Sequence, residues 1–230
     1  MTQNAADTRS DDAQDTVILL HGIGRTSRSM AFMARALAKN GFAPLGITYP
    51  SRRHGIPTLS DYLEKRLDDE GAWQPPGKVH FVTHSMGGLL VRHFLETRKV
   101  RLPVDSIGRV VMLGPPNGGS EVADQLHKLP PYKWFYGPAG QELTTDARSR
   151  NQALPYYEIG VIAGSRGWPY FVANHMVPAP HDGRVSVAKT KLIGMKDHIA
   201  LPATHSFIAW NPSVHRQTCH FLKTGQFTRS

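Results

Sequence analysis

One serine in this sequence has neighbours that favour nucleophilic chemistry. Ser85 follows an apolar run at 79–83 and precedes a glycine-rich stretch whose later apolar residues have helical spacing. A sharp strand-to-helix turn at this point would lift its hydroxyl clear of a sheet. Gly87 has a steric reason there, because a side chain two residues after the serine would strike the neighbouring strand. Thr83 stands where the pattern G-x-S-x-G has glycine, and the competing interpretation is a serine that only caps the helix.

Acyl transfer to a serine also needs two N–H donors aimed at the oxygen that becomes negative. One candidate is the backbone N–H of Met86, at a helix start where amides lack partners and the helix dipole is positive. The other is the backbone N–H of Ile23, in His21-Gly22-Ile23-Gly24 directly after the apolar run 17–20. The glycines would let the backbone approach a substrate, and His21 is expected to order the loop. A plain strand-to-helix turn is the alternative.

A serine nucleophile needs a histidine base that a carboxylate holds in one tautomer. With the acid placed between Ser85 and the base in chain order, Asp182 is the best candidate, although an Asp-Gly turn alone would also explain it. The rival carboxylates are Glu121, Asp124, Glu142, Asp146, Glu158 and Asp197. His205, just before the final expected helix, is favoured over His198 as the base. His84 is too close in sequence to reach the hydroxyl, and we expect it to form a wall of the pocket.

The elements that must position these residues alternate along the chain. Apolar runs typical of buried strands lie at 17–20, 44–49, 79–83, 109–113, 157–163 and 189–193. Helical apolar spacing occurs at 30–38, at 59–67, after 85, and from 206 or 212 to 222. This alternation predicts an α/β fold with a mostly parallel central sheet flanked by helices, whose site lies at the carboxyl ends of the strands. Thr26 or Ser27 and Thr58 are the expected helix caps, and His215 and His220 fall inside the last helix as structural residues.

The segment 121–153 breaks this alternation. It is rich in proline and aromatic residues, among them Trp134, Phe135 and Tyr136. We interpret it as a small insertion that caps the site, with the three aromatic side chains as an acyl pocket. An ordinary loop that packs its own aromatic residues is the alternative.

Composition and charge exclude several classes of protein. The 230 residues are 40% hydrophobic and 20% charged, which is typical of a globular chain. We expect a disordered polar tail at 1–15 and a single domain at 16–230. No run approaches the roughly 20 apolar residues of a membrane helix. The basic residues behind the net charge of +9 form no stripe interleaved with aromatic residues, so nucleic-acid binding is not expected, whereas peripheral contact with a membrane stays open.

The cysteine and histidine content bears on compartment and metal binding. Cys219 is the only cysteine, which excludes an internal disulfide and fits a reducing compartment. The polar opening lacks the apolar core of a secretory signal. We therefore expect a cytoplasmic protein, with a periplasmic or secreted location as the alternative if a signal has been removed. The 12 histidines show no zinc-site spacing with cysteine, so no metal is expected.

Several motifs occur together and in a fixed order. They lie at 21–24, 83–88, 113–120, 182–187 and 204–206. From about Val17 onward the chain resembles the lipase-like branch of the α/β-hydrolase superfamily. The resemblance implies that Ser85 attacks an ester carbonyl, His205 takes its proton and Asp182 orients the imidazole. It also implies that the amides of Ile23 and Met86 bind the oxyanion, supported by Gly22, Gly24, His21, His84 and Gly87, and that no cofactor is needed. His181 stands where relatives often carry asparagine.

The expected function is hydrolysis of a small-molecule ester or lipid through an acyl-enzyme. The same three residues would serve an acyltransferase, a thioesterase, an amidase or a lactonase, and these alternatives stay open. A non-catalytic hydrolase fold that binds a ligand belongs to a different class, and the complete set of reactive residues argues against it. Acyl-chain length, the physiological substrate, the oligomeric state and any movement of 121–153 are not determined by the sequence.

Overall fold

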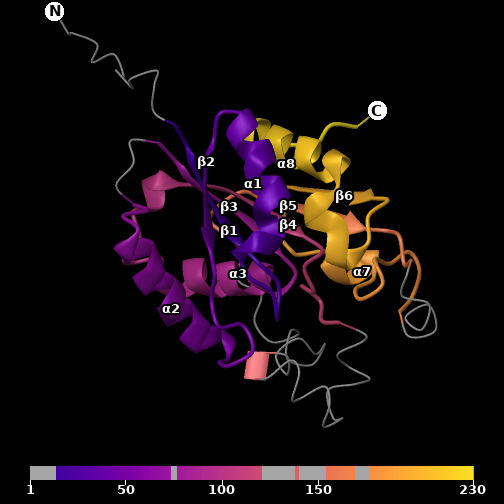
Figure 1. Cartoon of the computed structure of the whole chain (residues 1–230), viewed down its shortest axis with the longest axis horizontal. Coiled ribbons are helices and arrows are strands. Elements are labelled where there is room, and N and C mark those ends of the chain that lie inside the picture. The colour runs from indigo at the N-terminus through magenta and orange to yellow at the C-terminus, as the bar shows by residue number, and fades with distance from the viewer. Residues whose placement is uncertain (1–13, 74–76, 121–137, 140–153, 169–176, 230) are drawn as a thin grey trace, which may run out of the picture.

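The computed structural model describes residues 14–73, 77–120, 138–139, 154–168 and 177–229 (Figure 1). Six parallel strands form one sheet in the order β2-β1-β3-β4-β5-β6. The expected α/β fold with a parallel central sheet is therefore confirmed. The strands are β1 (Thr16–Leu20), β2 (Ala43–Ile47), β3 (Val79–His84), β4 (Ile107–Leu113), β5 (Ile159–Gly164) and β6 (Asp197–Leu201).

Helices cover both faces of the sheet. They are η1 (Ser27–Met30), α1 (Ala31–Lys39), α2 (Ile56–Asp69), α3 (Met86–Arg98), η2 (Val104–Ser106), α7 (Val187–Thr190), η4 (His205–Trp210) and α8 (Pro212–Thr224). Helix α1 packs against α8 and η4, whereas α2 packs against α3, and Figure 1 shows each pair side by side. Because the strands are parallel, every strand-to-helix turn after β1, β3 and β6 lies at the same edge of the sheet.

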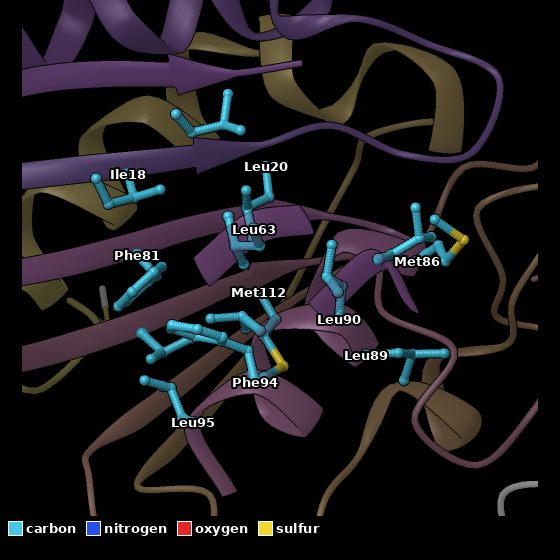
Figure 2. Packing of buried hydrophobic residues seen from close by; sticks show 14 of the residues in the cluster. Ile18, Leu20, Leu63, Phe81, Met86, Leu89, Leu90, Phe94, Leu95 and Met112 are labelled. Carbon is cyan, nitrogen blue, oxygen red and sulfur yellow. The ribbon is translucent and has the colours of Figure 1, made fainter. Parts of the chain in front are cut away.

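Successive strand residues alternate between two apolar layers, as the two-residue period of a strand requires. Phe81 of β3 and Met112 of β4 lie in the layer that α2 and α3 cover, where they meet Leu63 and Phe94 (Figure 2). Their sequence neighbours lie in the second layer, against α1 and α8. That layer includes Val17, Leu19, Val82, Val111, Leu113, Met33, Leu37 and Phe221. A sheet buried on both faces explains why the central strands read as unbroken apolar runs.

The prediction of a strand at 189–193 is wrong. Residues 187–190 form the short helix α7, and the sixth strand is β6. The Ser186 side chain accepts a hydrogen bond from the Lys189 amide at 3.3 Å, and Thr190 Oγ1 donates to the Val187 carbonyl at 2.7 Å. These local bonds satisfy a helical turn and compete with strand pairing. β6 is an edge strand whose residues are partly exposed, so its apolar signal is weak.

The expected helix caps are also corrected. Helix α2 begins at Ile56, with Gly55 at the cap position and Pro57 in the first turn, so Thr58 lies inside the helix. Proline suits this place because its missing N–H has no partner in a first turn. Neither threonine nor serine caps η1, because Thr26 makes no side-chain cap bond and Ser27 bonds Thr48 instead.

Three expectations concern the ends and the insertion. The tail was expected to include residue 15, but the Asp15 carboxylate accepts a hydrogen bond from the Lys78 amide at 2.7 Å and belongs to the fold. Residues 1–13, the insertion 121–153 apart from 138–139, and the aromatic residues 134–136 lie outside the described residues. Within the described ranges, the helices are too short or too polar to span a membrane.

Candidate active site

The turn between β3 and α3 holds Ser85 in a conformation that side chains rarely adopt. Its φ of 54° and ψ of −123° make it the one non-glycine residue with positive φ among those the structure describes. Such a conformation costs on the order of 1–3 kcal/mol and persists only where its surroundings fix it. Two backbone bonds do so: the Ser85 amide donates to the Leu113 carbonyl at 2.9 Å, and the Gly88 amide donates to the Ser85 carbonyl at 2.9 Å.

The glycines after the serine have steric reasons. A Cβ on Gly87 would lie 2.8 Å from the Leu20 carbonyl oxygen, so the expected clash with the neighbouring strand is present. A Cβ on Gly88 would lie 3.3 Å from Thr83 Oγ1. Thr83 is completely buried, and its hydroxyl has no hydrogen-bond partner in the described structure. The missing side chain at Gly88 therefore makes room for a threonine where glycine is usual.

Three side chains from separate segments form one hydrogen-bonded chain. Ser85 Oγ lies 3.0 Å from His205 Nε2, and His205 Nδ1 lies 2.7 Å from Asp182 Oδ2. Ser85 follows β3, whereas His205 opens η4 just after β6, so residues 120 positions apart meet at the carboxyl edge of the sheet. A carboxylate can only accept, so Nδ1 carries the proton and Nε2 is free to accept one from the hydroxyl.

The Asp182 carboxylate is completely buried and fixed in orientation. Its Oδ1 accepts from the amides of Arg184 at 3.0 Å and Val185 at 2.9 Å, which leaves Oδ2 for the imidazole. The His205 amide also donates to the Asp182 carbonyl at 2.9 Å. The two residues are thus joined through backbone and side chain. These bonds hold the carboxylate and the imidazole ring in one relative orientation.

Gly114, part of the motif at 113–120, also lies at the site, although no role was predicted for it. It follows β4 with φ of 55°, and a Cβ there would lie 2.9 Å from Asp182 Oδ2 and 3.4 Å from His205 Nδ1. The strand-ending Leu113-Gly114-Pro115-Pro116 run is the sequence signal that points to it. A bare backbone at this position lets Asp182 and His205 pack against the end of β4.

The two expected oxyanion donors lie at the same edge. Met86 is the first residue of α3, so its amide has no partner within the helix. Ile23 lies in the turn after β1, which two contacts hold in place. The Gly24 amide donates to Ser51 Oγ at 2.9 Å, and Tyr49 donates its hydroxyl to the His21 carbonyl.

His21 orders this loop through its ring, as expected. Nδ1 donates to the Gly22 carbonyl at 2.8 Å, and Nε2 accepts from the Tyr49 amide at 3.2 Å. The two rings stack with centroids 4.1 Å apart. Burial lowers the pKa of His21 to about 4, so the ring is neutral near pH 7 and keeps this donor–acceptor pattern.

His84 contacts His205 from behind. Its ring is buried and packs against Gly22, where a Cβ would meet Nδ1 at 2.9 Å. Its Nε2 donates to the His205 carbonyl at 3.0 Å. Burial, and then the nearby His205, hold the pKa of His84 well below its ordinary value. A neutral ring at this position adds no positive charge beside His205.

The other histidine and carboxylates considered for the base and the acid lie away from Ser85 or pair with other groups. His198 is inside β6, and its Nε2 is paired with Thr190 Oγ1 at 3.0 Å. Glu158 pairs with Arg109 at 2.6 Å, and Asp197 accepts from the Phe227 amide at 2.7 Å. The other rival carboxylates, Glu121, Asp124, Glu142 and Asp146, lie outside the described residues. Across the described ranges, His, Cys, Asp and Glu form no group of three or more that could hold a metal ion.

Comparison with known proteins places the chain among hydrolases. The model of the "Alpha/beta hydrolase family" matches residues 17–217. By sequence, the chain matches none of the curated proteins searched. Among solved structures it is similar to the mature lipase BlEst2 of Bacillus licheniformis, with 21% identity, a TM-score of 0.68 and coverage of 86% of this chain and 88% of that one.

Two further solved structures have the same fold. A metagenomic carboxyl esterase, MGS0156, has 18% identity and a TM-score of 0.65, with 84% of this chain and 65% of that chain covered. The RedJ thioesterase of Streptomyces coelicolor has 13% identity and a TM-score of 0.61, with 97% and 90% covered. Identities this low establish only the shared fold, whereas the family model spans most of the sequence. The chain therefore belongs to the alpha/beta hydrolase family.

Proposed function

We propose that this protein is a serine hydrolase that cleaves carboxylic esters through an acyl-enzyme on Ser85. The observation that carries the proposal is the continuous hydrogen-bonded chain from Ser85 Oγ through His205 to Asp182, at 3.0 and 2.7 Å. The strained backbone of Ser85 adds support, because strain of this kind gathers at functional sites. The relatives of similar fold include a lipase, a carboxyl esterase and a thioesterase.

The first half of the reaction forms the acyl-enzyme. Ser85 Oγ attacks the ester carbonyl carbon while His205 Nε2 takes the hydroxyl proton. The carbonyl oxygen becomes negative and accepts hydrogen bonds from the amides of Met86 and Ile23. The tetrahedral intermediate then expels the alkoxide, which receives the proton from Nε2 and leaves as the alcohol.

The second half regenerates the serine. Water attacks the acyl carbon and gives its proton to His205 Nε2, and the bond to Ser85 Oγ breaks. The proton returns to Ser85, and the carboxylic acid is released. Asp182 stays ionised throughout and stabilises the imidazolium that forms twice in the cycle.

Labelling and turnover test the proposal together. The purified protein should react with a fluorophosphonate probe at Ser85 and hydrolyse p-nitrophenyl esters. Ser85→Ala and His205→Gln should lose both, whereas His198→Gln, at the rival histidine, should keep both within about threefold. If the wild-type chain neither labels nor hydrolyses any ester from acetate to palmitate, the proposal is wrong.

Product analysis separates the alternatives that share the same triad. Ester product formed with added alcohol, or amide formed with added amine, in preference to free acid would identify an acyltransferase. A panel of acyl thioesters, anilides and lactones at equal concentration ranks the leaving groups. If a Ser85→Ala variant keeps the biological activity, the non-catalytic binding module is correct instead.

A further inference from the structure

The positive charge of this chain is confined to part of the sequence. Residues 16–60 and 198–230 contain nine Lys and Arg residues and no Asp or Glu. The remainder of the chain contains 18 of each sign, so these two segments account for the entire net charge of +9. They include β1, β2 and the elements η1, α1, η4 and α8. These four helical elements pack together over one face of the sheet. They hold five of the nine basic residues, Arg28, Arg35, Lys39, Arg216 and Lys223, so a net positive charge gathers there.

Three exposed aromatic side chains lie together on this face. Phe32 of α1, Phe207 and Trp210 of η4 are 49%, 45% and 42% exposed. Their rings form one cluster, with centroids 5.5 Å apart for Phe32 and Trp210 and 5.2 Å for Phe207 and Trp210. Arg35 lies 5.6 Å over the Phe32 ring. Contiguous exposed apolar surface on a soluble domain usually marks an interaction site.

The position of the aromatic cluster connects it with the candidate active site. Phe207 follows the base His205 by two residues within η4. The Trp210 indole N–H donates to the Ser29 carbonyl at 2.9 Å, which ties η4 to η1 and keeps the cluster together. Helix α1 begins near the carboxyl end of β1, at the same edge of the sheet as Ser85. A surface bound to the cluster would therefore lie beside the reacting groups.

We infer that the aromatic cluster of Phe32, Phe207 and Trp210, with the surrounding basic face, docks the protein on the surface of an anionic phospholipid bilayer. Exposed Trp and Phe side chains enter the boundary between headgroups and acyl chains, and basic residues are attracted to anionic headgroups. The elements η1, α1, η4 and α8 contain no acidic residue, which fits a surface of one charge sign better than a mixed one. The inference rests on the proposed function, because bilayer lipids are esters and docking would bring them to Ser85. Binding to the bilayer can nevertheless be measured without ester hydrolysis.

Vesicle co-sedimentation tests the docking in the inactive Ser85→Ala background. The full chain should sediment with vesicles of phosphatidylcholine and phosphatidylglycerol, and much less with phosphatidylcholine alone. Loss of Arg28 and Arg35 by substitution with Gln should weaken binding about 25-fold, at about fivefold per charge. Phe32→Ser should weaken it about tenfold, because a half-exposed ring no longer enters the interface.

Matched variants on other surfaces provide the controls. Lys99→Gln with Arg101→Gln removes the same charge after α3, and Ile193→Ser removes a side chain that is 66% exposed before β6. Both should bind vesicles like the parent chain. If these controls lose as much binding as the Arg28, Arg35 and Phe32 variants, or if the parent does not prefer anionic vesicles, the inference is overturned.

A soluble substrate separates this inference from the proposed function. With Ser85 intact, the Arg28/Arg35 and Phe32 variants should hydrolyse p-nitrophenyl acetate within twofold of the wild-type rate and keep its circular dichroism spectrum. Vesicle binding without ester hydrolysis would overturn the proposed function and leave the docking surface in place. Ester hydrolysis without vesicle binding would overturn the docking surface alone. The same conclusion would follow if the basic face captured an acidic protein in preference to anionic vesicles.

Discussion

Replacing Asp182 by asparagine should leave the fold intact while reversing the tautomer of the base. The carboxylate oxygen Oδ1 accepts from two buried amides, those of Arg184 and Val185. The asparagine carbonyl oxygen must take that place, so its NH₂ group faces His205 Nδ1. Nδ1 then has to accept a hydrogen bond, the ring proton moves to Nε2, and Nε2 can no longer take the proton of Ser85.

The size of the effect follows from these bonds. Flipping the asparagine to restore the productive tautomer would place NH₂ against two amide N–H groups. Each buried donor left without a partner costs about 1–3 kcal/mol, so the productive orientation lies roughly 2–6 kcal/mol higher. At 1.36 kcal/mol per tenfold, kcat/KM should fall between about 30-fold and about 3 × 10⁴-fold. Loss of the carboxylate charge beside the imidazolium moves the expectation toward the upper end.

Initial rates of p-nitrophenyl ester hydrolysis and the urea midpoint would test this expectation. Asp197→Asn is the matched control, because Asp197 also accepts from two amides, of His198 and Phe227, but lies at the start of β6. It should lower stability while keeping kcat/KM within about threefold. A folded Asp182→Asn protein with more than a tenth of the wild-type kcat/KM would refute the assigned role of Asp182.

Three further predictions have defined outcomes. Burial lowers the pKa of His21 to about 4, so as pH falls this histidine is protonated in the unfolded chain before it is protonated in the folded one. Up to about 3 kcal/mol of unfolding free energy should therefore be lost between pH 6.5 and 4. Urea titrations of the His21→Gln variant should lack this loss. Gly114→Ala places a methyl group 2.9 Å from Asp182 Oδ2 and should lower kcat/KM more than tenfold, whereas Gly41→Ala, also at positive φ but with no atom within 4 Å, should lower only stability. The loss of unfolding free energy caused by Gly88→Ala should be about 1 kcal/mol smaller in a chain that also carries Thr83→Ala. The reason is that the new Cβ would otherwise lie 3.3 Å from Thr83 Oγ1. Additive changes in unfolding free energy in the double-mutant cycle would contradict this contact.

Much of the fold could be predicted because its signals are local. The runs at 17–20, 79–83 and 109–113 are buried on both faces, and the structure has β1, β3 and β4 there. The prediction failed for the last strand, where β6 lies at an exposed edge and Ser186 and Thr190 stabilise a helical turn at 187–190. Side-chain bonds to the nearby backbone decided that segment, and hydrophobic periodicity does not register them.

The serine turn was also readable locally, since a strand, a sharp turn and glycines within ten residues are enough to indicate it. The choice between His198 and His205 was not local. Both follow β5 in the sequence, yet one ring pairs with Thr190 and the other reaches Ser85 across 120 residues. Gly114 was overlooked for the same reason, because its importance comes from contacts with Asp182 and His205.

The sequence by itself determined the family, the parallel α/β architecture, the serine turn and the order in which Ser85, Asp182 and His205 occur along the chain. Those features depend on apolar periodicity and on backbone geometry within a few residues. Only the tertiary structure decided which histidine and which carboxylate meet the serine, why threonine fits at 83, and which exposed rings gather beside His205. These depend on distances between elements that the parallel sheet brings to one edge, and spacing along the chain does not encode those distances.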